Sequence, residues 1–192
     1  MSSPLYELKK EDWNRLFPIH LVDHDSNWSL VFEEEKELIL SQIGYMKPAQ
    51  IEHVGSTSVS GIRAKPYIDI LVVVSEEWMF SEELIAKMAE IGYTYFLVPK
   101  MDQIESYMSF GKGYNLEGKP EQIFHIHLCP KDNFMVNQIE FRDRLRENPD
   151  LAKAYETIKN ESAEKFKNDR GGYRNSKSDF ILEVLGVSQK ST

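Results

Sequence analysis

The stretch IEHVGSTSVSGIRAKPYIDIL, residues 51–71, decides the fold of this chain. It predicts a short strand over Gln50–Val54, a turn of small residues, and a second strand over Tyr67–Val74. The second strand is almost continuously apolar and rich in β-branched residues, which is typical of a central strand. The turn begins at Gly55 and ends at Pro66. We therefore expect a sheet built around Tyr67–Val74.

Asp69 is the one charged residue inside this apolar strand. A buried carboxylate is costly unless a metal ion, a cation or several donors hold it, so we predict a catalytic or metal-binding role. Gly55 lets the backbone approach a ligand, and the hydroxyls and amides of Ser56 and Thr57 are predicted to bind phosphate oxygens. A Walker phosphate loop is excluded, because Gly55 and Gly61 enclose five residues instead of four.

A histidine pair lies on another predicted strand, Gln122–Leu128. His125 and His127 are two residues apart, so both imidazoles point to one face. If this strand neighbours that of Asp69, the three side chains can bind a transition metal or contact phosphate, with His127 as ligand or acid–base group. The alternative is a hydrogen-bonded strand histidine at the edge of the core. A histidine-triad hydrolase is rejected, because Cys129 occupies the position of its third histidine.

The remaining elements are predicted from apolar spacing, capping residues and turn residues. The last two strands are expected to form a hairpin around a glycine-rich turn. The sum is one α+β domain over 1–192, with a mixed sheet of about five strands, helices packed on it and a helical C-terminal third. Helices are predicted over 28–43, 81–91, 135–147, 151–167 and 175–185, and further strands over 93–98, 105–110 and 122–128.

Composition excludes several classes of protein. The formal net charge of −8 argues against a general duplex-DNA binder, which normally carries a basic surface. No apolar run approaches the roughly 20 residues that cross a bilayer, and the amino terminus lacks a secretory signal. A cytoplasmic location is therefore expected. The single cysteine, Cys129, allows no internal disulfide and is expected to be a buried, inert thiol.

Basic residues concentrate late in the chain. Residues 1–140 hold 12 Lys and Arg against 22 Asp and Glu, whereas residues 141–177 hold 10 against 7. This segment either faces a small anionic ligand or is a solvated helical surface. For the first alternative we predict anion contacts from four side chains, the last of which lies at the start of the Asp69 strand: Arg142, Tyr173, Lys177 and Lys65.

The order of Gly-Ser, about a dozen residues and an Asp in an apolar strand resembles the signature of polymerase-β-type nucleotidyltransferases. In those enzymes a second acid follows two positions later, and two divalent ions position a nucleoside triphosphate. Here Leu71 occupies the position of the second acid, which argues against a two-metal mechanism.

A more specific resemblance is to the GrpB family, whose members have a nucleotidyltransferase-like fold and are sometimes attached to a dephospho-CoA kinase. It spans roughly Ile19 to Leu185. The chain departs from it at residues 58–60, where Ser-Val-Ser replaces the usual Ala-Val-Pro. The matching positions are Asp25, Trp28, Phe32, residues 52–57, Gly61, residues 64–66, residues 68–70, His125, His127, residues 141–146, Tyr155, Lys159, Tyr173, Lys177 and Phe180.

Together these patterns predict a nucleotidyltransferase-like protein that binds a nucleotide or a phosphorylated small molecule beside Asp69. The expected cofactor is a divalent metal: Mg, Mn or a transition metal. The enzyme hypothesis is metal-dependent nucleotidyl transfer. The alternative is a non-catalytic module of the same fold that senses a ligand or docks on a partner enzyme, with dephospho-CoA kinase suggested by the resemblance.

Overall fold

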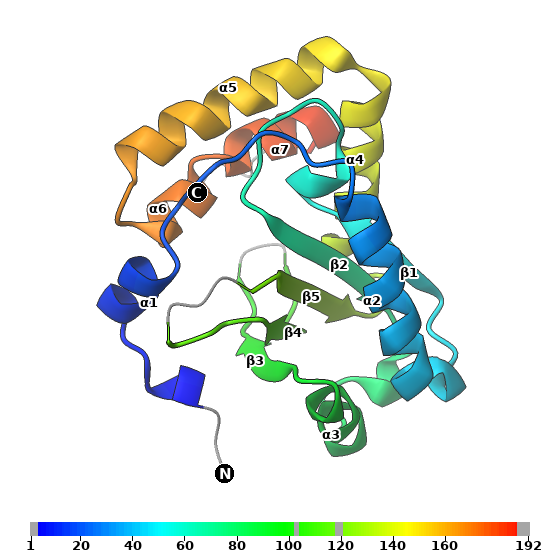
Figure 1. The fold of residues 1–192 in the computed structure, drawn as a ribbon. Helices are drawn as coiled ribbons and strands as arrows, with labels where there is room; N and C mark the ends of the chain where they lie inside the picture. The colour runs from blue at the N-terminus through cyan, green and yellow to red at the C-terminus, as the bar shows by residue number, and fades with distance from the viewer. Residues whose placement is uncertain (1–3, 102–103, 118–120, 188–192) are drawn as a thin grey trace.

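A computed structural model describes residues 4–101, 104–117 and 121–187 and shows an α+β fold (Figure 1). Its five-stranded sheet has the order β1-β2-β5-β4-β3. Strands β2 and β5 are parallel, and the other neighbours are antiparallel, including the predicted hairpin of β4 and β5. The mixed sheet is therefore confirmed. Its strands are β1 (Gln50–Val54), β2 (Tyr67–Val73), β3 (Thr94–Val98), β4 (Tyr107–Lys112) and β5 (Ile123–Cys129).

Helices cover both faces of the sheet. In Figure 1, α2 and α3 lie on one side of it, α4 to α7 lie on the other, and α1 lies beside α6. Among the described residues no helix combines the length and apolarity needed to cross a bilayer. The helices are α1 (Lys10–Leu16), α2 (Trp28–Ile43), α3 (Glu82–Glu90), α4 (Asn137–Glu147), α5 (Pro149–Lys165), α6 (Arg170–Asn175) and α7 (Ser178–Leu185), with short 3-10 turns η1 (Pro4–Glu7), η2 (Gly44–Met46), η3 (Ser56–Ser58), η4 (Glu76–Trp78) and η5 (Phe134–Val136).

The main apolar core lies between the sheet and helices α2 and α3. Ile68, Ile70 and Val72 alternate along β2 and point to this face, where all three are buried. Burying a side chain of this size is worth roughly 1.5–3 kcal/mol, so this layer anchors the sheet. Its other members include Phe32, Ile39, Leu84, Met88, Met108, Phe110, Ile126 and Leu128.

The opposite face of β2 carries Asp69, Leu71 and Val73. Leu71 and Val73 are buried in a second apolar cluster with Val54 and Cys129. The Cys129 thiol is free, and burial raises its pKa to about 12, so it stays protonated, as an inert thiol does. Asp69 is the one charged residue on this side of the strand, and it lies at the end nearer the amino terminus of β2.

Capping residues place several helix starts where the sequence predicts them. The Ser81 side chain accepts a hydrogen bond from the Leu84 amide before α3, and Asn148 accepts one from the Leu151 amide before α5. Two predictions need correction. The helix expected over 175–185 begins later, as α7 at Ser178, and a separate helix, α6, precedes it. In addition, α1 was not predicted. Both missed helices are short and depend on contacts with each other.

Candidate functional site

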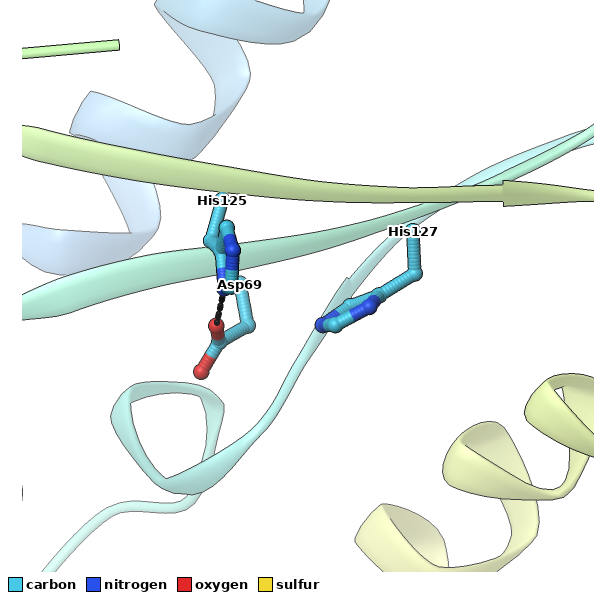
Figure 2. Close-up of side chains that lie close together, drawn as sticks. All are labelled: Asp69, His125 and His127. Atoms are coloured by element: carbon cyan, nitrogen blue, oxygen red, sulfur yellow. Dashed lines mark ion pairs between the residues drawn. The ribbon is translucent and has the colours of Figure 1, made fainter. Parts of the chain in front are cut away.

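The parallel pairing of β2 and β5 brings the predicted acid and histidines together. In this register Asp69 lies opposite His125 and Leu71 lies opposite His127, so the three polar side chains share one face. One potential ligand atom from each lies within 4.8 Å of the other two. Figure 2 shows His125 beside the Asp69 carboxylate, at 3.7 Å from Nδ1 to Oδ1, and His127 facing the same space.

The donor set suits a divalent transition metal. One carboxylate with two imidazoles is a ligand combination of zinc, iron, manganese and related ions, whereas Mg²⁺ prefers oxygen ligands. The buried Nδ1 of His127 has no hydrogen-bond partner in the described part of the chain. A buried polar atom without a hydrogen bond lowers the stability of the folded state. Ligation of a metal ion by this imidazole would offset that loss. The residues therefore fit a metal ion.

The protonation states also suit ligation. Burial, and then the neighbouring His125, lower the pKa of His127 to about 4, so its ring is neutral at pH 7. Burial by itself would raise the pKa of Asp69, but the adjacent His125, with smaller contributions from His127 and Lys65, lowers it overall. Asp69 is therefore an anion beside the neutral ring of His127, which is the state that binds a cation.

Gly55 brings the backbone close to the Asp69 carboxylate. It follows Val54, which pairs with Asp69, and has a φ of +69°. A Cβ at this position would lie 2.4 Å from Asp69 Oδ2. The next residue, Ser56, lies in η3 near the Tyr155 phenol of α5. Gly55 and Ser56 therefore lie at this site, between Asp69 and the helical cover.

Thr57 does not contribute its hydroxyl to the site, contrary to the prediction. The side chain is 3% exposed, its Oγ1 donates to the Tyr67 carbonyl at 2.9 Å, and it lies 3.0 Å from His53 Nε2. Since the single hydroxyl proton is used on Tyr67, His53 must be the donor of the second bond. Thr57 is thus a structural link, and His53 lies on the other face, stacked on Phe32.

Arg142 also has a structural role instead of the predicted anion contact. Its Nη1 donates to Glu52 at 2.7 Å and to the His53 carbonyl at 2.8 Å, and its Nε donates to Asp143 at 2.8 Å. The side chain is 9% exposed. These bonds hold α4 against β1 and use three of the five guanidinium N–H donors, and the carboxylates of Glu52 and Asp143 offset the Arg142 charge.

The other predicted cations gather near Asp69. The Lys65 ammonium lies 4.7 Å from the Tyr67 ring centre and 5.7 Å from that of Tyr173, and the Lys177 ammonium lies 3.9 Å from Tyr173. Burial, followed by the charge of Arg170, lowers the pKa of Lys65 to about 8; burial, followed by the charge of Lys65, lowers that of Lys177 to about 7. Within the described residues neither ammonium has a carboxylate ion pair.

Two further residues near Asp69 were missed in the sequence. Tyr114 lies in the turn after β4, and Arg170 begins α6; both are electrostatically coupled to groups of the site. Neither belongs to a periodic apolar pattern or a motif, so no sequence signal identifies them. Their position depends on how distant segments pack.

A mixed sheet whose Gly-Ser turn faces a strand acid beneath a helical cover defines a nucleotidyltransferase-like α+β protein. Comparison with known proteins gives the family: the model described as "GrpB protein" matches residues 18–186. The chain therefore belongs to the GrpB family.

Individual relatives match over most of the chain. A glutamate-rich protein GrpB of Alkalihalophilus pseudofirmus is 36% identical over 165 residues, covering 86% of this chain and 92% of that protein. A UPF0157 protein of Streptomyces coelicolor is 31% identical over 167 residues, covering 86% and 82%. The crystal structure of conserved protein GrpB from Enterococcus faecalis matches with a TM-score of 0.72 and 29% identity, covering 87% of this chain and 95% of that one.

Proposed function

We propose that this protein binds one divalent metal ion through Asp69, His125 and His127 and holds a nucleotide or a phosphorylated small molecule beside it. The observation that carries the proposal is the convergence of three ligand atoms within 4.8 Å. The ligand set favours Mn or Zn over Mg. Leu71, which is fully buried, occupies the place where a second acid would extend the site to two metal ions.

A phosphorylated ligand is supported by the charges around the metal ligands. Lys65 and Lys177 are desolvated beside Asp69 without a carboxylate partner of their own among the described residues. Arg170 and Arg174 add positive charge close to these lysines. A protein with a net charge of −8 thus concentrates cations at one place, and an anion would offset their mutual repulsion.

In the enzyme version of this proposal the reaction is metal-dependent nucleotidyl transfer. A bound ion would polarise a phosphoryl oxygen, while Lys65 and Lys177 would neutralise charge on the other oxygens and Gly55 would leave room for the ligand. If His127 binds the metal ion, it cannot also act as the acid–base group, so another group or water must transfer the proton.

Leu71 favours a second candidate, a non-catalytic module that binds the same ligand without turnover. Such a module would act in the cytoplasm by docking on a partner enzyme, and the family resemblance suggests dephospho-CoA kinase.

Metal titration tests the proposal. Protein stripped with EDTA is titrated with Mn²⁺, Zn²⁺ and Mg²⁺ by calorimetry, and bound metal is counted by mass spectrometry. We expect one tightly bound Mn²⁺ or Zn²⁺, and at least a tenfold loss of affinity in Asp69→Asn and His127→Ala. The matched controls are Asp132→Asn and His20→Ala, which make the same substitutions at exposed positions. Equal affinity in all four variants would contradict the proposed site.

Nucleotide assays then separate the two candidate functions. Metal-loaded protein is incubated with nucleoside triphosphates, and pyrophosphate release is measured beside binding. Turnover that disappears in Asp69→Asn supports the enzyme, whereas binding without pyrophosphate release supports the module.

A further inference from the structure

Tyr114 is folded back over the strand that flanks His125. Gly111 of β4 pairs with His125, and a Cβ at Gly111 would lie 2.6 Å from Cε2 of the Tyr114 ring. Gly113, with a φ of +82°, makes the turn that reverses the ring; a Cβ there would lie 2.0 Å from the Gln122 carbonyl oxygen. Both glycines are thus required to bring Tyr114 next to the metal ligands.

The Tyr114 hydroxyl can donate a hydrogen bond to a ligand. The Arg170, Tyr67 and Asp69 side chains are near enough to its oxygen to influence it electrostatically. Burial raises the pKa of Tyr114, so the phenol remains protonated at neutral pH. No hydrogen bond joins this phenol to another of the described residues, so its proton is available to a ligand.

The segment at residues 4–17, which contains η1 and α1, supports this arrangement. Trp13 and Phe17 pack edge-on against Tyr114, with ring centres 5.2 and 4.9 Å away. Arg170 donates to the Phe17 carbonyl at 2.5 Å and lies over the Trp13 ring. Further bonds join this segment to the loop before α6, from Asn14 to the Asn168 carbonyl and from Lys10 to Asp169. The segment precedes residue 18, where the match to the family begins.

We infer that Tyr114 and Arg170 form an anion-binding pair beside the metal ligands, and that residues 4–17 position this pair. The Tyr114 hydroxyl donates to a phosphoryl oxygen of the ligand, and Arg170 supplies positive charge behind it. Tyr114 is therefore a ligand-contacting residue, whereas Trp13 is a positioning residue that acts through it. The inference rests on the proposed phosphorylated ligand and names two residues that recognise it.

The test measures pyrophosphate binding by calorimetry, once in EDTA and once with Mn²⁺. Tyr114→Phe removes only the hydroxyl, and Gly111→Ala displaces the ring while leaving the phenol in the chain. The matched control is Tyr45→Phe, which alters an exposed tyrosine bonded to Glu83. We expect a roughly tenfold loss of pyrophosphate affinity in Tyr114→Phe and Gly111→Ala and none in the control, with Mn²⁺ affinity unchanged within about twofold.

The role of residues 4–17 is tested with a double-mutant cycle. Trp13→Ala should lower pyrophosphate affinity in the wild-type background but not in the Tyr114→Phe background, because its effect passes through the phenol. Equal losses in both backgrounds would overturn the positioning role of Trp13.

The outcomes separate this inference from the proposed function. Unchanged pyrophosphate affinity in Tyr114→Phe overturns the inference even if Mn²⁺ binds normally. A parallel loss of Mn²⁺ affinity in Tyr114→Phe also overturns it, since the residue would then support the metal ligands instead of the anion. If wild-type protein binds pyrophosphate in EDTA but binds no metal, a loss in Tyr114→Phe upholds the inference while the metal proposal fails. Absence of pyrophosphate binding under both conditions overturns both.

Discussion

Gly55 leaves the space that the Asp69 carboxylate occupies: a Cβ on residue 55 would lie 2.4 Å from Oδ2 and 3.0 Å from the Asp69 Cβ. The glycine is required for two reasons, its φ of +69° and this contact. The first reason concerns the backbone and the second concerns the orientation of a proposed metal ligand. A second glycine in the same turn, Gly61, allows the effect of backbone strain and the effect of the contact with Asp69 to be measured separately.

Gly55→Ala should reduce metal affinity, whereas Gly61→Ala should not. Gly61 has a φ of +79° but open space around its Cβ position, so both variants carry backbone strain and only Gly55→Ala displaces Asp69. Both should lose roughly 1 kcal/mol or more in the free energy of unfolding, measured in urea. Mn²⁺ titration should show a loss of about tenfold or more for Gly55→Ala alone. Equal metal affinity in the two variants would argue against the Asp69 site.

Sulfate binding should weaken as the pH rises from 6.5 to 9. The pKa values of Lys177 and Lys65 are about 7 and about 8, so both lysines lose positive charge in this range while sulfate keeps its charge. Calorimetry in buffers of different ionisation enthalpy should show proton uptake on binding at pH 8. Lys177→Met should reduce the uptake, and Lys131→Met, an exposed control, should not. Affinity that does not vary with pH would show that the lysines do not contact the anion.

His53 should make the protein less stable in mild acid. Burial lowers its pKa in the folded state to about 4, compared with 6.5 in the unfolded chain. As the pH falls from 6.5 towards 4, His53 is protonated in the unfolded chain but stays neutral in the folded protein. The free energy of unfolding therefore decreases, by up to about 3 kcal/mol. His127, with a pKa also lowered to about 4, adds to the loss.

The measurement is urea unfolding at pH 7.0, 5.5 and 4.5. His53→Gln should flatten the pH dependence relative to wild type, and His20→Gln, at an exposed position, should leave it unchanged. Parallel curves for wild type and His53→Gln would show that His53 titrates normally in the folded protein.

The buried carboxylate of Glu35, in α2, should stabilise the packing of this helix on the sheet face opposite Asp69. It is 6% exposed and accepts hydrogen bonds from the Lys112 ammonium, at 2.8 Å, and from the Tyr93 phenol, at 2.9 Å. Glu35→Gln leaves the Lys112 charge without its partner and should cost about 3 kcal/mol of unfolding free energy. The neighbouring exposed residue provides the control Glu34→Gln, which should change stability by less than about 0.5 kcal/mol. Similar urea midpoints for the two variants would contradict this role.

Local patterns in the sequence were sufficient for most elements of the fold. The bounds predicted for α2 and β1 agree with the structure, because both depend on periodicity and turn residues within a few positions. The two-residue spacing of His125 and His127 placed both imidazoles on one face for the same reason. The strand expected over 105–110 begins two residues later, at Tyr107. It also ends two residues later, since Gly111, which reads as part of a turn, pairs with His125 inside β4.

What the sequence by itself determined were the strands, most of the helices, and the residue types capable of metal and anion chemistry. Only the tertiary structure decided which of them meet: the parallel register joins Asp69 to His125, packing commits Thr57 and Arg142 to structural bonds, and α1 holds Tyr114 and Arg170 near Asp69. The physical reason is range. Periodicity and capping act over a few residues, whereas the partner of a hydroxyl or a guanidinium is chosen by segments that are distant in the chain and adjacent only after folding.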